Sequence, residues 1–156
     1  MLKTGDKLIE FCLQGITPEG VEKSYRNTDF LGKYLVIYFY PKDNTPGCTK
    51  ESCNFNALLS QISNKANIIG ISADSIESHK KFQLKYSLKF PLLSDSGASF
   101  AKSLGAYKES IIEKLITKGI KRTTFLVDTN GFINHIWYDV KVNNHDIEVL
   151  NALNSL

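Results

Sequence analysis

The sequence predicts an α/β sandwich, in which strands and helices alternate along the chain. Residues 34–40 form an apolar run of mostly β-branched and aromatic side chains, and residues 67–72 form a second one. Such runs are typical of buried strands. Each is followed by a segment with the spacing of an amphipathic helix. Near the end of the chain, Asn130 and Gly131 predict a tight hairpin turn before a last helix.

Length and composition indicate one compact soluble domain over residues 1–156. The chain is 42% hydrophobic and 22% charged, which is ordinary for globular proteins. The net charge is +3 and the lysines are scattered, so nucleic-acid binding is not expected. We expect no signal peptide, because Lys3, Thr4 and Asp6 make the start of the sequence polar, and no membrane-spanning segment, because no apolar run is long enough. Three cysteines are an odd number, which favours a reducing cytoplasm over a secreted disulfide scaffold.

The first third of the chain predicts a small hairpin. Residues 8–14 and 21–27 have the composition of short strands around a turn at residues 17–20. A helical turn is expected over residues 28–33, ended by Gly32. Cys12 lies in the first strand between two apolar residues, and we expect it to be a buried packing thiol.

The segment that carries chemistry runs YPKDNTPGCTKESC from Tyr40 to Cys53. Thr45 is a good N-cap, and Pro46 fits the first helical position, so Cys48 falls in the first turn of a helix that ends near residue 65. The free N–H groups and the helix dipole favour a thiolate there. The alternative is a buried, inert cysteine, but a polar turn after a strand is a poor place for one.

The spacing of Cys48 and Cys53 indicates a disulfide that forms and breaks with a change in the helix, and not a permanent one. Two helical residues five positions apart have Cα atoms roughly 8–9 Å apart, and a disulfide needs less than about 7 Å. The two thiols can join only if the first turns of the helix unwind. A metal site is less expected, because the chain has no second cysteine pair and no nearby histidine.

The middle of the chain continues the alternation. A capping box from Asp74 to Glu77 predicts a helix over residues 75–87. His79 stands beside two lysines and is expected to face solvent. Residues 90–95 predict a short strand, at an edge or beginning at Pro91.

The last third predicts mixed elements. One or two helical turns are expected over residues 98–104. Residues 106–121 have apolar residues at helical spacing, which favours a surface helix. Strands are expected over residues 122–127 and 132–138. The final helix, residues 144–156, has an apolar face built from Ile147, Leu150 and Leu153.

Pro41, Thr45 and Cys48 match the PxxxTxxC signature of the peroxiredoxins. The longer string PKDNTPGCTKESC resembles the PrxQ branch, also called the bacterioferritin comigratory protein group, and so does the region of residues 75–95. This resemblance implies a thioredoxin-like fold, with a central mixed sheet flanked by helices and an N-terminal β-hairpin.

The resemblance also implies a thiol-specific peroxidase for hydrogen peroxide and organic hydroperoxides. In this interpretation Cys48 becomes a sulfenic acid, Cys53 resolves it as an intramolecular disulfide, and a thioredoxin or glutaredoxin returns the electrons. Thr45 offers its hydroxyl and Pro41 shapes the loop. Arg122, at the start of the strand RTTFLVD, supplies the cation. No cofactor and no metal is expected, and the protein is expected to be a monomer with a role in antioxidant defence.

Two other functions compete with this one. A dithiol oxidoreductase of the thioredoxin type uses Cys-x-x-Cys, whereas four residues separate the cysteines here. A redox-sensing or chaperone-like binding module would form the same disulfide without turnover. Sustained peroxide consumption in the presence of a reductant separates the enzyme from the module.

Overall fold

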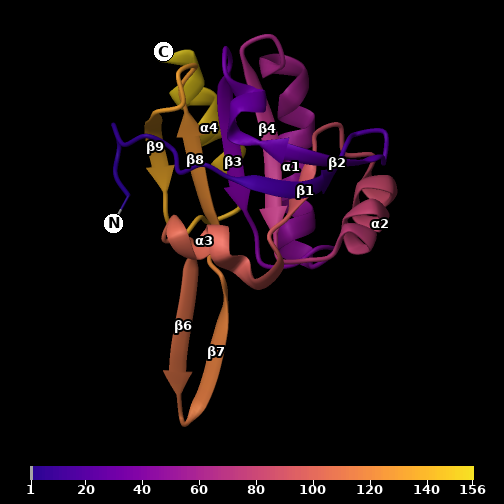
Figure 1. The fold of residues 1–156 in the computed structure, drawn as a ribbon, viewed down its shortest axis with the longest axis vertical. Coiled ribbons are helices and arrows are strands. Elements are labelled where there is room, and N and C mark those ends of the chain that lie inside the picture. Colours follow the sequence, from indigo (N-terminus) through magenta and orange to yellow (C-terminus); the bar gives the residue numbers. More distant parts are fainter. Residues whose placement is uncertain (1) are drawn as a thin grey trace.

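The structure is a computed structural model that describes residues 2–156, and its centre is a seven-stranded mixed sheet (Figure 1). The strand order is β2-β1-β5-β4-β3-β8-β9. In chain order these strands are β1 (Cys12–Ile16), β2 (Glu22–Arg26), β3 (Tyr34–Phe39), β4 (Ala66–Ser72), β5 (Leu92–Ser94), β8 (Thr123–Val127) and β9 (Ile133–Trp137). A separate two-stranded sheet contains β6 (Tyr107–Ile112) and β7 (Leu115–Ile120).

Four α-helices accompany the sheet. They are α1 (Pro46–Ile62), α2 (Ile76–Tyr86), α3 (Ser99–Ser103) and α4 (His145–Asn154). Two short 3-10 helices are η1 (Asn27–Phe30) and η2 (Ser96–Ala98). The predicted α/β architecture with an N-terminal hairpin, β1–β2, is therefore confirmed.

Strand β3 is the middle of the fold and separates two apolar clusters. It pairs in parallel with β4 and antiparallel with β8, and its residues from Leu35 to Phe39 are buried. Since side chains alternate along a strand, Leu35, Ile37 and Phe39 face one cluster, and Val36 and Tyr38 face the other.

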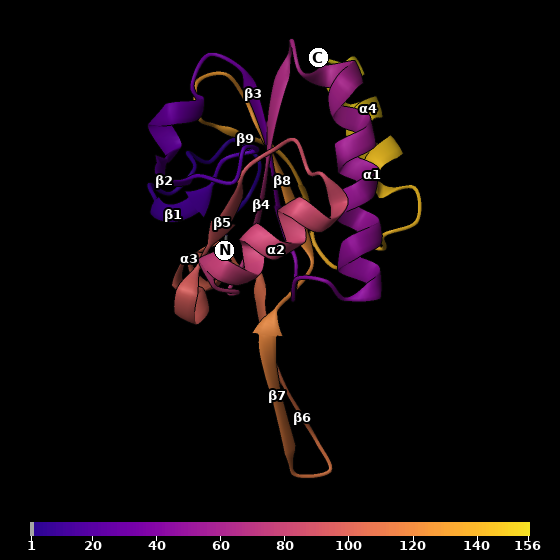
Figure 2. The ribbon, with the colours of Figure 1, turned by 90° about the vertical axis from the view of Figure 1, so that its right-hand side faces the viewer.

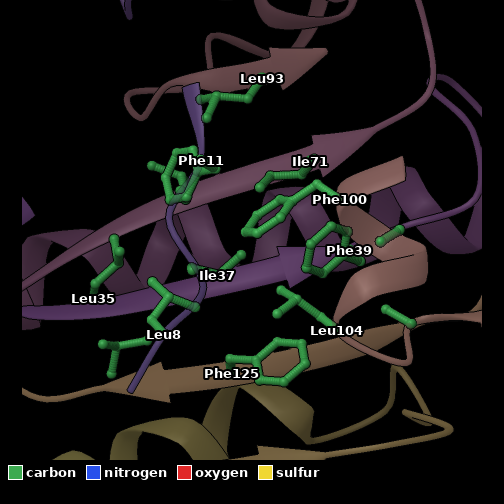
Figure 3. Close-up of a cluster of buried hydrophobic side chains, with 14 of the residues drawn as sticks. Leu8, Phe11, Leu35, Ile37, Phe39, Ile71, Leu93, Phe100, Leu104 and Phe125 are labelled. Carbon is green, nitrogen blue, oxygen red and sulfur yellow. The ribbon is translucent and has the colours of Figure 1, made fainter. Parts of the chain in front are cut away.

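The two clusters are covered by different elements. Figure 2 shows α1 and α4 together on one side of the sheet and α3 on the opposite side. The cluster beneath α1 and α4 also receives Phe82 of α2. The opposite cluster is rich in aromatic rings, and in Figure 3 Phe11, Phe39 and Phe100 lie close together. The end of β3 is thus fixed from both sides, and the loop after it starts from a rigid point.

The helix predicted over residues 106–121 is wrong, because this segment is the β6–β7 hairpin, which projects away from the rest of the molecule (Figure 2). Ile111 pairs with Ile116 and Ile112 pairs with Leu115, and all four are more than half exposed. The turn residues, Glu113 and Lys114, both have positive φ. The apolar spacing that suggests a helix face also allows cross-strand pairing, because the hairpin brings Ile111 to Ile116 on one face and Ile112 to Leu115 on the other. A Glu-Lys pair carries no turn signal.

Cys12 is not the buried thiol that we expected. It is exposed on β1, with its Sγ 3.4 Å from the Oγ of Ser24 on β2. Strand alternation puts Cys12 on the same face as Gln14, which is also exposed. The apolar neighbour Phe11 takes the buried position instead.

Two details of the helix ends and faces also differ from expectation. Ser75 is the N-cap of α2 and its side chain accepts a hydrogen bond from the Ser78 amide, whereas Asp74 lies outside the helix. In α4 the buried positions are His145, Val149 and Leu153, and the predicted inner residue Ile147 is 49% exposed.

Gly70 of β4 has a packing role that a substitution can test. A Cβ at this position would lie 2.7 Å from the ring of Tyr38, which is fully buried beneath α1. We expect Gly70→Ala to lower the free energy of unfolding by about 1–3 kcal/mol, because the ring has no room to move. Urea unfolding measures this difference.

Gly119→Ala is the matched control, since Gly119 is also in a strand but has no atom near the position of an added Cβ. Its stability should stay close to that of the wild type. Equal stability of the two variants would contradict the packing role of Gly70.

Candidate active site

The loop between β3 and α1 places Cys48 at the start of a helix. Thr45 is extended at the N-cap position, with φ −91° and ψ 155°, and Pro46 begins α1. The Thr45 side chain does not cap the helix, because its Oγ1 donates to the carbonyl of Lys42 at 2.9 Å. The amides of Gly47 and Cys48 belong to the first turn, which has no carbonyl partners within the helix. An anion at the thiol therefore faces free N–H groups.

Arg122 lies directly against Cys48, although 74 positions separate them in the sequence. It precedes β8, which pairs with β3 in the centre of the sheet. Its Nη2 donates to the Sγ of Cys48 at 3.4 Å, and its Nη1 donates to the Oε1 of Glu51 at 2.8 Å. Cys48 itself is 1% exposed. The guanidinium thus places a positive charge and a hydrogen-bond donor directly at the Cys48 sulfur.

Glu51 is a site residue that the sequence analysis did not identify. It is 2% exposed, and its Oε2 has no hydrogen-bond partner within residues 2–156. Burial raises the pKa of Glu51 from 4.5 to about 7, and Arg122 offsets part of this effect. The available signal was its position one turn after Cys48, which puts both side chains on the same face of the helix.

The ion pair also acts on Arg122. Burial lowers the pKa of the Arg122 guanidinium, but Glu51 and Cys48 outweigh this effect and the pKa is raised. Arg122 therefore stays charged at every pH at which the protein is folded, and its fork of donors divides between a carboxylate and a thiol.

The loop that carries Pro41 and Thr45 is anchored through Asp43. This buried carboxylate accepts hydrogen bonds from the hydroxyl of Tyr40 at 2.6 Å and that of Ser78 at 2.8 Å. The Nδ1 of His79 is 2.7 Å from Asp43, and the Asp43 amide donates to Asp74. These contacts hold the loop against α2.

His79 is fully buried, so our prediction that it faces solvent is wrong. Its other ring nitrogen is 2.9 Å from the carbonyl of Leu93 on β5. His79 lies on the inner face of α2, three residues from both Ile76 and Phe82. His79 is buried because of the helix face on which it lies, and the polarity of its two neighbouring lysines has no bearing on this.

Pro41 and Arg122 both line a pocket of about 400 Å³. Pro41 is exposed and Thr45 is half-buried, so both stand at the surface above the buried thiol. Four of the five predicted site residues, namely Pro41, Thr45, Cys48 and Arg122, thus gather around the start of α1.

Cys53 lies further along the same helix and does not contact Cys48. Both thiols are free, and Cys53 is half-buried, which raises the pKa of its thiol. The buried positions of α1 include Ser52 and Phe55 but not Cys53. In this state of the molecule the two cysteines are held apart by an intact helix.

Comparisons with known proteins give the family of this chain. The model of the AhpC/TSA family matches residues 4–136. The chain is 44% identical to the putative peroxiredoxin bcp of Coxiella burnetii, over 97% of this chain and 99% of that protein. It is 40% identical to Peroxiredoxin Bcp of Bacillus subtilis, over 99% and 97%. The chain belongs to the AhpC/TSA family, in the Bcp/PrxQ subfamily of peroxiredoxins.

Solved structures of this subfamily have the same fold. A cysteine-to-serine mutant of Xanthomonas campestris Peroxiredoxin Q superposes with a TM-score of 0.86 and 37% identity, covering 93% of this chain and 90% of that one. Peroxidoxin BcpB of Mycobacterium tuberculosis gives 0.83 and 30%, covering 100% and 99%. The predicted thioredoxin-like fold is confirmed. As a Bcp peroxiredoxin, the protein is a thiol peroxidase that reduces peroxides and an antioxidant enzyme.

None of the helices within residues 2–156 is long and apolar enough to cross a membrane. In the same part of the chain, no group of three or more His, Cys, Asp or Glu side chains is arranged to hold a metal ion.

The raised pKa of Glu51 predicts a pH dependence of stability. The folded protein keeps a proton on Glu51 up to about pH 7, whereas the unfolded chain releases it near pH 4.5. This contribution is fully present below pH 4.5 and is lost as the pH rises through 7. It amounts to roughly 3 kcal/mol. Urea unfolding between pH 5 and pH 8 under reducing conditions measures it.

Glu51→Gln should remove most of this slope, since an amide does not titrate. Glu113→Gln, at the exposed tip of the β6–β7 hairpin, is the control and should retain the wild-type slope. If Glu51→Gln and the wild type lost stability in parallel over this pH range, the burial of Glu51 would not be the cause.

Proposed function

We propose that Cys48 is the peroxidatic nucleophile of this enzyme. Its thiolate attacks one oxygen of the hydroperoxide and the O–O bond breaks. The other oxygen leaves as hydroxide or alkoxide and takes up a proton, while Cys48 becomes a sulfenic acid. The observation that carries this assignment is the contact of 3.4 Å between the Arg122 guanidinium and a thiol in the first turn of a helix.

Arg122 has two tasks in this step. Its charge stabilises the thiolate before the reaction, and its donors stabilise the negative charge that develops on the oxygens as the O–O bond lengthens. Glu51 fixes the position of the guanidinium. Thr45 offers a hydroxyl at the mouth of the site, and Pro41 shapes the loop above Cys48.

Cys53 then acts as the resolving cysteine. Its thiol attacks the sulfenic sulfur of Cys48, a Cys48–Cys53 disulfide forms and water leaves. A dithiol protein of the thioredoxin or glutaredoxin type reduces this disulfide by exchange and completes an atypical 2-Cys cycle in a monomer. Hydrogen peroxide and organic hydroperoxides are both substrates in this proposal. Support for the second class comes from a structure of the Xanthomonas campestris bacterioferritin comigratory protein, which is described in terms of its alkyl peroxide reduction activity.

Single cysteine variants separate the two roles. Cys48→Ser should abolish peroxide consumption, because the nucleophile is lost. Cys53→Ser should consume about one equivalent of peroxide and then stop when thioredoxin is the only reductant. Stopped-flow measurement of peroxide consumption tests both. Cys12→Ser is the control and should turn over normally, since Cys12 lies on the exposed face of β1. Normal turnover by Cys48→Ser would refute the assignment.

Oxidation should unwind the start of α1. The helix holds the two Cα atoms roughly 8–9 Å apart, which is beyond the reach of a disulfide. Residues 49–55 should therefore exchange their amide hydrogens much faster in the oxidised protein than in the reduced one. The amides of α4 are the internal reference and should change little.

Hydrogen exchange followed by mass spectrometry tests this on both redox forms. Gly47, Thr49, Ser52 and Asn54 are modest or poor helix formers, so little free energy is needed to open the segment. Strong protection of residues 49–55 in both forms would exclude the intramolecular disulfide.

A further inference from the structure

A pocket beside the active site has no task in the reaction described so far. It measures about 400 Å³, which falls in the range of small-molecule sites. One wall is Pro41 and Arg122, and the others are the base of the β6–β7 hairpin and residues 139–141. Because Arg122 also contacts the Cys48 thiol, a molecule in this pocket has access to the guanidinium that serves the reaction.

Cationic residues dominate the lining of the pocket. They are Lys108, Lys118, Lys121, Arg122 and Lys141, against a single acidic residue, Asp139. Three of the cations have partners on the protein. Lys118 lies 4.0 Å from Glu109, Lys121 stands over the ring of Tyr138, and Arg122 pairs with Glu51.

Lys108 and Lys141 differ from the other three. Both are exposed, and within residues 2–156 neither has a carboxylate within 4.0 Å of its ammonium group. The hydrogen bond from the Val140 amide to the Arg122 carbonyl, 3.0 Å long, holds the loop before Lys141 beside the catalytic arginine. Two unpaired charges from two different segments of the lining attract an anion into the pocket.

The hairpin leaves room for such an anion. Lys108 on β6 is opposite Gly119 on β7, which has no side chain, and a Cβ at Gly119 would meet no atom within 4 Å. A hydrogen peroxide molecule is uncharged and far smaller than this space. The size and the charge of the pocket both fit a larger, anionic substrate.

We propose that this pocket binds the carboxylate of an organic hydroperoxide, so that the enzyme favours hydroperoxides that carry a negative charge. This inference rests on the proposed peroxidase function. The carboxylate occupies the pocket between Lys108 and Lys141 and does not react. The hydroperoxide group of the same molecule lies on the Arg122 side, where its O–O bond breaks as described above and the alcohol is released.

A matched pair of substrates tests the proposal. Cumene hydroperoxide is neutral, and the same compound with a para-carboxylate carries one negative charge at neutral pH. With dithiothreitol as reductant, the wild type should show the higher kcat/KM for the carboxylate compound, mainly through a lower KM. Addition of salt should reduce this preference, because the charges of Lys108 and Lys141 are exposed.

Charge variants assign the preference to the pocket. Each of Lys108→Gln and Lys141→Gln should reduce the ratio of the two kcat/KM values roughly two- to fivefold, as expected for exposed charges. The double variant should reduce it about tenfold if the two effects multiply. Lys114→Gln is the control, since it removes the same charge from the tip of the same hairpin, outside the pocket, and should keep the wild-type ratio.

A binding experiment gives a readout without turnover. The unreactive analogue para-isopropylbenzoate should shift amide NMR signals of the pocket walls in the reduced wild type. Gly119→Val should weaken this binding severalfold by filling the space opposite Lys108 without changing any charge. The neutral analogue isopropylbenzene should cause no comparable shifts at Lys108 or Lys141.

The outcomes separate this inference from the peroxidase function. If the wild type consumed no peroxide, the proposed function would fail. The binding of para-isopropylbenzoate would still show whether the pocket binds a carboxylate. Equal ratios in the double variant and in Lys114→Gln would overturn the carboxylate site. So would a double variant that lost only its recycling by thioredoxin, because the lysines would then serve a protein partner.

Discussion

The ion pair between Arg122 and Glu51 is the contact on which the geometry of the candidate active site depends. Arg122 enters from the start of β8 and Glu51 from the second turn of α1, and their contact at 2.8 Å joins the sheet to the helix. Breaking a buried ion pair by removing one partner costs about 3–5 kcal/mol. The same contact leaves one Nη of Arg122 free to reach the Cys48 thiol. The carboxyl group of Glu51 thus positions the cation that contacts the Cys48 thiol.

The loop before α1 depends on a second buried polar cluster. Asp43 joins the loop to α2 through Ser78 and His79, and His79 continues to the carbonyl of Leu93 on β5. These groups form one connected hydrogen-bond network, which restricts the loop. In the proposed reaction this restraint keeps the donors around Cys48 in place before charge develops.

In the proposed cycle the first turns of α1 must be folded at one stage and unfolded at another. They hold Cys48 against Arg122 before the reaction and must release both cysteines afterwards. The hydroxyls of Tyr38 and Ser52 are 2.7 Å apart in the buried core, and Phe55 packs against the Tyr38 ring. These contacts with β3 stabilise the helix, whereas the residues in its first turns have low intrinsic helix propensity. Tertiary packing, more than local propensity, therefore sets the free energy of the switch.

The sequence by itself determined the elements whose signals are local. The apolar run of β3, the Thr45-Pro46 start of α1 and the Asn130-Gly131 turn depend on neighbouring residues only, and the structure has all three where they were expected. The PxxxTxxC signature is equally local, and it indicated the family that the comparisons established. Local chemistry was also enough to identify Cys48 as the candidate nucleophile.

Only the tertiary structure decided what depends on distant partners. The contact between Arg122 and Cys48 spans 74 positions, and the partner of the buried Glu51 is the same distant arginine. His79 and Cys12 were misjudged because burial depends on which face packs against the sheet, not on adjacent residues. The β6–β7 hairpin was missed because the spacing of its four apolar residues suits one face of a helix and also suits two cross-strand pairs beside a tight turn. Contacts between residues that are distant in the sequence decide between such alternatives. Local sequence patterns do not reveal these contacts.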